Sequence, residues 1–156
     1  MVDHPAEQLQ PELRRWRAPL RAGLLALPIG SAPEPFIDVQ DVADVAAVLL
    51  TSDGHYEKAY ELSGPRALTF GEAVEMMAEA AGQAIRFAEL TPEAYRAELV
   101  AGGASEDAVE EVDAMFAAMR AGHLAEPTDA VRQVLGREPA GFGDYVARAA
   151  ATGAWS

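Results

Sequence analysis

The sequence predicts a mixed α/β fold with a few short strands and a helical carboxyl-terminal part. Two observations support this. In the first ninety residues, short apolar runs alternate with stretches whose apolar residues recur at helical spacing. After residue 91, further helical stretches follow one another without a strand signal between them. The length of 156 residues is that of one domain, so we predict a single domain over residues 1–156, with residues 1–11 as a loose arm.

The stretch from Pro35 to Leu50 organises the rest of the chain. Apolar and β-branched residues at 36–39 predict a strand, and the apolar positions that follow then share one face of a helix. Asp41 is the predicted N-cap, because its carboxylate can accept hydrogen bonds from the free N–H groups of the first turn. Asp38 and Asp44 add negative charge near the positive end of the helix dipole.

Around this stretch, the order of strands and helices is predicted from local signals. Residues 12–22 predict a short helix that carries the only basic stretch, and residues 24–29 predict a strand or an extended edge. Residues 60–62 and 85–90 predict two further strands.

The remaining helices are predicted from their caps. Thr69 and Glu72 form a capping box, and Gly82 ends that helix. Thr91 begins the next one, with proline at its first position. Three more follow: residues 106–121 capped by Ser105, a short helix capped by Thr128 or Asp129 and ended by Gly136, and a last helix around residues 142–149.

Composition excludes several classes of function. The chain has 25 acidic and 12 basic residues, a formal net charge of -13, and would repel phosphate backbones and anionic membrane surfaces. It has no cysteine, which excludes disulfides and thiol catalysis and fits a reducing cytoplasm. The polar, acidic start is unlike a signal peptide, and no apolar run approaches the roughly 20 residues that span a bilayer. We therefore expect a cytoplasmic protein that binds neither nucleic acid nor membranes.

Two groups of polar residues are candidates for catalysis. Asp38, Asp41 and Asp44 form the densest carboxylate cluster, and paired carboxylates can divide acid and base roles. The alternative is N-capping and a solvated helix start. His123 follows the longest helix and is a candidate general base or substrate contact, the alternative being a surface histidine. We therefore predict Asp38, Asp41 and His123 as catalytic, and no metal site, because the three histidines lack metal-ligand spacing.

Four side chains are candidates for an apolar binding pocket. Tyr95, Met115, Phe116 and Met119 combine adaptable methionine walls with one polar tip, the tyrosine hydroxyl. The alternative interpretation of these residues is ordinary core packing.

Short segments in a fixed order resemble a known family. They are residues 36–43, 60–65 and 68–73, and residues 136–139 with Phe142 and Tyr145. In this order they resemble the carboxyl-terminal half of NmrA-like proteins, a group of atypical short-chain dehydrogenase/reductases.

The resemblance implies a truncated Rossmann-like fold whose strands would join the edge of a larger parallel sheet. It implies that Phe36 lies beside the substrate cleft, and that the region of His123 faces it. The family's glycine-rich turn for the dinucleotide pyrophosphate is absent here, and so is the reductase Tyr-x-x-x-Lys pair, since Lys58 stands two residues after Tyr56. The sequence therefore predicts no cofactor and argues against an independent NAD(P)-dependent oxidoreductase.

Two functions follow as hypotheses. The first is a cofactor-free remnant of such a reductase that binds an apolar or aromatic metabolite and steers a non-redox step, such as cyclisation or isomerisation, by positioning. The alternative is a non-catalytic interaction or regulatory module that pairs with a separate NAD(P)-binding chain. Because a few strands left alone would expose a sheet edge and an apolar face, we expect a homodimer or a partner chain to cover them.

Overall fold

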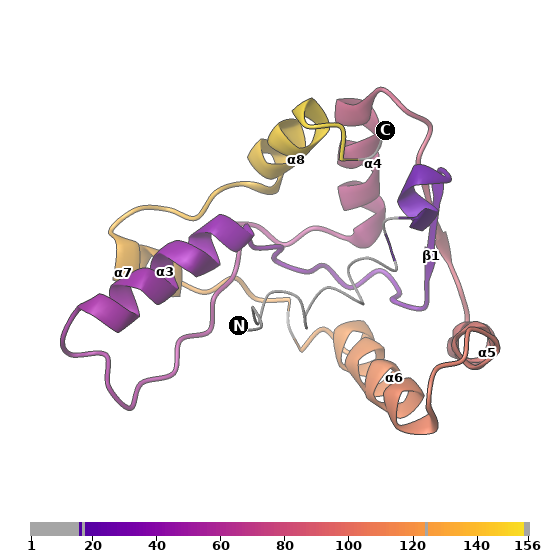
Figure 1. Ribbon diagram of the computed structural model, residues 1–156, viewed down its shortest axis with the longest axis horizontal. Coiled ribbons are helices and arrows are strands. Elements are labelled where there is room, and N and C mark those ends of the chain that lie inside the picture. The colour runs from indigo at the N-terminus through magenta and orange to yellow at the C-terminus, as the bar shows by residue number, and fades with distance from the viewer. Residues whose placement is uncertain (1–15, 17, 124, 155–156) are drawn as a thin grey trace, which may run out of the picture.

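The computed structural model describes residue 16, residues 18–123 and residues 125–154. The predicted loose arm and residues 12–15 and 17 of the predicted basic helix lie outside the described residues, and residues 16 and 18–21 are helical. In the described part, α3 and α7 lie together at one end, α5 and α6 lie at the other, and α4 and α8 lie side by side between them (Figure 1). No helix in this part of the chain is both long and apolar enough to cross a membrane.

The sheet of the described residues consists of two parallel strands. β1 (Leu24–Leu27) pairs with β2 (Arg86–Glu89), and Leu25 lies opposite Phe87. Both strands were predicted, with slightly wider bounds. Because parallel strands need a crossover connection, the helices α3 (Val39–Thr51) and α4 (Phe70–Ala81) lie between them in the chain. The fold is therefore mixed α/β and mostly helical.

Two of the predicted strands are wrong. Residues 36–38 and 60–62 belong to no strand, and helix α3 already begins at Val39. The extended segment before α3 makes one isolated antiparallel bridge, between Glu34 and Leu68. Proline on both sides of Glu34 explains why the ladder stops there, because proline has no N–H to donate.

The N-cap of α3 is also different from the prediction. Asp38, not Asp41, occupies the cap position, and its side chain accepts a hydrogen bond from the backbone N–H of Gln40 at 3.0 Å. Asp41 lies one turn further on, where its carboxylate is free to bind a distant segment.

The other predicted helices are confirmed. The capping box of α4 is complete, and Gly82 ends it in the left-handed conformation. Thr91 caps α5, and Ser105 caps α6. The remaining bounds are Pro92–Ala101 for α5, Glu106–Arg120 for α6, Ala130–Leu135 for α7 and Phe142–Ala151 for α8.

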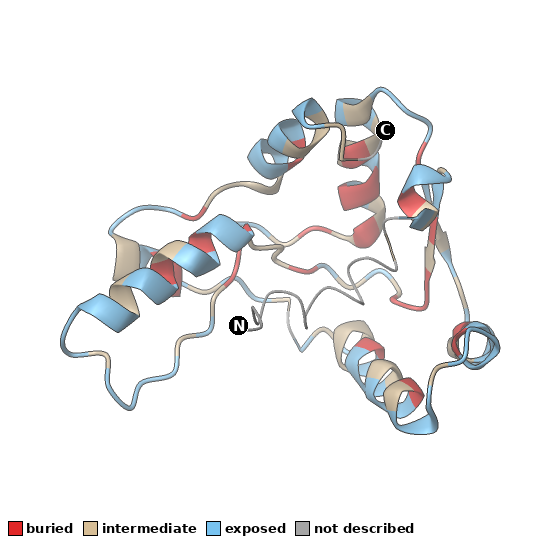
Figure 2. Cartoon of the chain, in the orientation of Figure 1, coloured by how far each residue is buried: buried red, intermediate tan, exposed pale blue. Residues whose placement is uncertain are grey.

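The core lies around the sheet and α4, which packs against both β2 and α8. Its most buried side chains include Leu27, Val74, Val109 and Phe116. Figure 2 shows buried positions facing inward on α4, whereas most of the surface of α3 is exposed. The helix α3 packs on α7 and stands apart from the main core, which makes the segment that joins it to the core important for the site described next.

Candidate functional site

An apolar cavity of about 540 Å³ opens between α4, α8 and the extended segment before α3. Aromatic rings line it in a chain of contacts. The Phe36 centroid lies 5.0 Å from that of Phe70 and 5.1 Å from that of Phe142, and Phe142 lies 5.9 Å from Tyr145. Trp16 meets Phe70 edge-on at 6.0 Å. These tilted and edge arrangements are the ones that aromatic pairs prefer, so the wall is an ordered aromatic surface.

Local structure places each ring. Phe70 is the first residue of α4, immediately after the Thr69 cap. Phe142 and Tyr145 are three residues apart in α8 and therefore share one helix face. Phe36 is held by a close backbone approach, because Gly64 donates its N–H to Pro35 O at 2.9 Å. A Cβ atom at Gly64 would lie 1.9 Å from the Phe36 carbonyl oxygen, so only glycine fits there.

A second cavity, of about 440 Å³, lies beside the first and has several charged side chains in its wall. The two share Asp38, Val39 and Tyr145. The charged wall of the second cavity adds Arg137 and Arg148. An apolar chamber and a charged chamber therefore meet at Asp38.

Asp38 is buried at this junction, with its side chain 5% exposed. One carboxylate oxygen accepts the backbone N–H of Gln40, and the other accepts from the Arg148 guanidinium. Arg148 is 58% exposed and reaches Asp38 from the charged cavity. The pair thus joins the start of α3 to α8.

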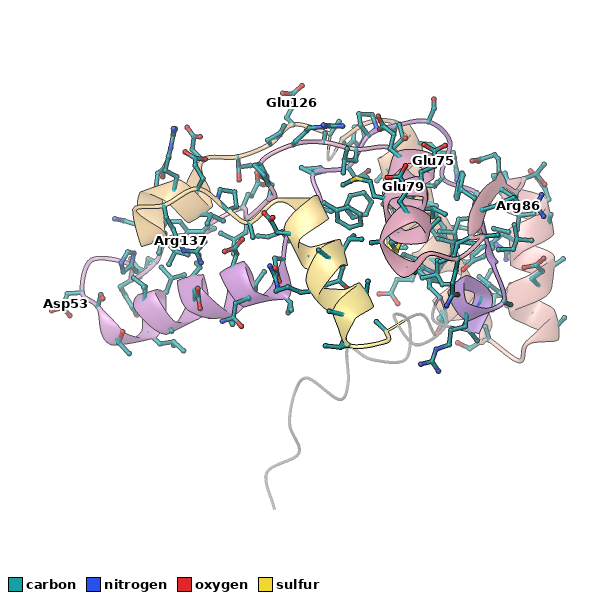
Figure 3. All side chains as sticks on the ribbon, turned by 90° about the horizontal axis from the view of Figure 1, so that it is seen from above. Asp53, Glu75, Glu79, Arg86, Glu126 and Arg137 are labelled. Carbon is teal, nitrogen blue, oxygen red and sulfur yellow. The ribbon has the colours of Figure 1, made fainter. Side chains whose placement is uncertain are left out.

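Asp41 anchors the loop between α7 and α8. It is 1% exposed, and Oδ1 lies 2.6 Å from Arg137 Nη1. Its Oδ2 accepts the backbone N–H of Ala140 at 2.7 Å. Figure 3 shows Arg137 between α7 and α3. Because both oxygens are occupied, Asp41 is well placed to hold the loop in position.

Asp44 completes the cluster on the surface. Gln40 donates to its Oδ1 at 2.8 Å, and Arg137 donates to its Oδ2 at 2.7 Å. These hydrogen bonds hold the pKa of Asp44 below its ordinary value, and the one from Gln40 has the largest effect. The hydrogen bonds to Asp41 and then to Asp44 raise the pKa of Arg137 above its ordinary value. Asp44 and Arg137 are therefore both charged at neutral pH.

The structure does not bring His123 together with Asp38 and Asp41. His123 is exposed beyond the end of α6 and lines none of the three cavities found in the described residues. The catalytic roles of these three residues remain predictions.

Of the five predicted apolar residues, Phe36 lines the apolar cavity. Tyr95 and Phe116 are buried and meet edge-on at 5.4 Å in the core, and Tyr95 also borders a separate cavity of about 310 Å³. Met115 is 39% exposed, and Met119 packs against the core. These residues therefore do not form one pocket with Phe36.

Sequence reasoning did not assign Phe70, Phe142 or Tyr145 to the cavity. The spacing of Phe142 and Tyr145, three residues apart on a helix, was a usable signal for a shared face. Nothing local indicates that this face meets Phe36, because Phe36 and Phe142 are 106 positions apart in the sequence.

A metal ion and a dinucleotide each require a particular set of protein groups. Over residues 16, 18–123 and 125–154, no group of three or more acidic or histidine side chains could hold a metal ion.

A pyrophosphate needs free N–H groups at a turn from strand to helix. After β2, however, the helix begins with Pro92, which has no N–H, and with the acidic Glu93. After β1, the N–H of Gly30 is already donated to Glu89 at 2.9 Å. Neither Pro92 nor Gly30 therefore has a free N–H to offer a pyrophosphate.

Comparison with known proteins places these features in context. No family model matches the chain. Over 133 residues it is 32% identical to an NAD(P)H azoreductase of Xenophilus azovorans, a match that covers 85% of this chain and 46% of that protein.

Two solved structures share the fold. They are the NADPH-dependent quinone oxidoreductase of Escherichia coli (TM-score 0.74, 19% identity, 89% of this chain and 49% of that chain) and the triphenylmethane reductase of Citrobacter sp. (TM-score 0.71, 24% identity, 88% and 47%). The chain thus spans about half the length of the proteins that it matches.

Proposed function

The chain is homologous to NmrA-like reductases, a group of atypical short-chain dehydrogenase/reductases, over about half of their length, and on this premise we propose that it binds an apolar, aromatic small molecule between α4 and α8. The proposal involves no dinucleotide, because neither Gly30 after β1 nor Pro92 after β2 has a free N–H to offer a pyrophosphate. A fold shared with reductases does not by itself carry an activity.

The observation that supports the proposal is the aromatic wall of the larger cavity. Its volume of about 540 Å³ lies within the range of small-molecule sites, and its wall combines apolar rings with one buried carboxylate. The names of the similar proteins mention triphenylmethane dyes and quinones, which contain conjugated rings. A flat aromatic ligand would stack against Phe36, Phe142 and Tyr145 and be excluded from water.

A reaction at this site would be a non-redox step steered by positioning, such as cyclisation or isomerisation. Asp38 is the carboxylate nearest to such a ligand, since it lines the apolar cavity. Its oxygens already accept hydrogen bonds from Gln40 and Arg148, which favours binding and orientation over proton transfer.

The test is a binding titration with the neutral fluorescent probe N-phenyl-1-naphthylamine. We expect saturable binding that weakens at least tenfold in Phe142→Ala, because that ring links Phe36 to Tyr145. The control is Tyr56→Ala, which removes an aromatic ring that is 88% exposed and lies outside the cavity. Absence of binding to the wild-type protein, or equal affinity in the Phe142 variant, would overturn the proposal.

A second candidate function is pairing with a separate chain that carries an NAD(P)-binding domain. The outer face of α3 supports it. Val39, Val42 and Leu50 are 74%, 38% and 85% exposed and follow helical spacing, with the exposed Ala43 and Ala46 between them. Soluble proteins rarely leave such an apolar stripe uncovered, and the similar proteins are about twice as long as this chain.

Light scattering tests this second function. We compare the mass of the purified protein, and of any NAD(P)-binding protein that copurifies with it, between the wild type and Leu50→Asp. A complex with such a protein that Leu50→Asp dissociates supports the pairing. A homodimer that dissociates in the same variant assigns the face to a second copy instead. A monomer of about the 16.5 kDa of one chain, with nothing bound, contradicts both.

A further inference from the structure

The charge at the apolar cavity comes from one side chain. Asp38 is the one charged residue among the described residues that line this cavity, and its side chain is 5% exposed. Arg148, its partner, lines the charged cavity on the other side and is 58% exposed. A ligand in the apolar cavity therefore meets the carboxylate, whereas the guanidinium stays behind it.

The carboxylate has capacity left for a ligand. An ionised carboxylate offers about four acceptor positions. Asp38 uses two of them, for the N–H of Gln40 and for Arg148. A neutral apolar ligand would leave the other two positions buried without partners, whereas a cation would pair with them.

The aromatic wall favours the same sign of charge. The faces of aromatic rings are negative, so they attract a cation that lies within about 6 Å of a ring centroid. Phe36, Phe142 and Tyr145 lie next to one another around the cavity that Asp38 closes. The net charge of -13 over the whole chain adds a long-range field that attracts cations and repels anions.

We propose that the cavity between α4 and α8 selects aromatic ligands that carry a positive charge, such as an arylalkyl ammonium or an iminium group. The cationic group lies against Asp38, and the ring stacks on the aromatic wall. This inference rests on the proposed small-molecule binding at the same cavity, and it adds the charge of the ligand.

The test uses three probes with the same bicyclic ring and different charge: 1-naphthylmethylammonium, 1-naphthalenemethanol and 1-naphthoate, titrated at pH 7 in low salt. We expect the ammonium to bind at least tenfold more tightly than the alcohol, and the naphthoate to bind most weakly. Added salt should reduce the difference between the ammonium and the alcohol, because salt screens the charge.

Two variants locate the selectivity. Asp38→Asn keeps a good N-cap for α3 but removes the charge, so the ammonium should lose its advantage while the alcohol binds as before. The matched control is Asp53→Asn, the same change at an exposed position at the other end of α3 (Figure 3), which should leave the ratio unchanged. Arg148→Gln leaves Asp38 in place and should keep or increase the preference for the ammonium, so it tests the proposal even if Asp38→Asn fails to fold.

The outcomes separate this inference from the proposed function. Equal binding of the three probes would overturn the charge selectivity and leave the aromatic site standing. Tightest binding of the naphthoate would also overturn it, because Arg148 would then control the site. Failure of all three probes to bind would overturn both proposals.

Discussion

Arg137 and Asp41 are joined across 96 positions of the chain, with Nη1 2.6 Å from Oδ1. The carboxylate is almost fully buried, and the guanidinium is 45% exposed. The same carboxylate accepts the N–H of Ala140, so one side chain in α3 holds the loop that leads into α8. Since α8 carries Phe142 and Tyr145, this pair also positions the wall of the apolar cavity.

Replacing Asp41 with alanine should loosen this loop. The half-buried N–H of Ala140 would lose its acceptor, which costs about 1–3 kcal/mol in the free energy of unfolding. Urea denaturation measures that loss, and hydrogen exchange should show faster exchange at the Ala140 amide. The control is Asp44→Ala, which also removes a partner of Arg137 but at the surface, so it should cost less. Equal effects of the two changes would contradict the anchoring role of Asp41.

Replacing Gly64 with alanine should be strongly destabilising. The added Cβ would lie 1.9 Å from the Phe36 carbonyl oxygen, so the segments around Phe36 and Gly64 must separate. The hydrogen bond from the Gly64 N–H to Pro35 O is then lost. The control is Gly71→Ala in the first turn of α4, where the nearest atom lies at 3.9 Å and alanine favours the helix. Thermal unfolding should show a clear fall in Tm for the first variant and no fall for the second. A Tm for Gly64→Ala equal to that of the wild type would show that the close approach is not required.

Glu34 should make stability fall as pH rises. It is buried, and its Oε1 has no hydrogen-bond partner among the described residues. Burial raises the pKa of its carboxyl above the ordinary 4.5, because a charged group is disfavoured away from water. The folded protein therefore holds this proton more tightly than the unfolded chain. The contribution of Glu34 to stability is favourable at low pH and is lost as pH rises from about 4.5 through the raised pKa.

The variant Glu34→Gln tests this assignment. It should have a higher Tm than the wild type at pH 7, and the difference should shrink below about pH 4, where both side chains are neutral. Glu79→Gln, on the exposed face of α4 (Figure 3), should show no such dependence on pH. A difference between Glu34→Gln and the wild type that stays constant from pH 3 to pH 7 would rule out a raised pKa.

The capping box of α4 has the opposite dependence on pH. Thr69 donates its backbone N–H to the Glu72 carboxylate at 2.8 Å, and its hydroxyl donates a second hydrogen bond to the same carboxylate. These two hydrogen bonds, of which the backbone one has the larger effect, hold the pKa of Glu72 below its ordinary value. Its contribution to stability is present above that ordinary value and is lost as pH falls through the lowered pKa. Thr69→Ala should cost about 1 kcal/mol at pH 7 and less at pH 3, as measured by urea denaturation. Thr51→Ala, at the exposed end of α3, is the control; a loss as large there would mean that the effect is not specific to the cap.

The sequence by itself determined the helices and both strands of the sheet. Thr69 with Glu72, Ser105 and Gly82 act on N–H and C=O groups within one turn, so their effect can be inferred from neighbouring residues. The apolar run at 24–29, predicted as a strand or an extended edge, and the alternation at 85–90 are likewise local signals.

The tertiary structure decided which of these elements meet. It placed Asp41 against Arg137 instead of at a helix cap, and it left residues 36–38 outside any strand. It also brought Phe36, Phe70 and Phe142 together to form the cavity. These contacts join segments tens of residues apart, and their free energy depends on burial and on distances that exist only once the chain has folded.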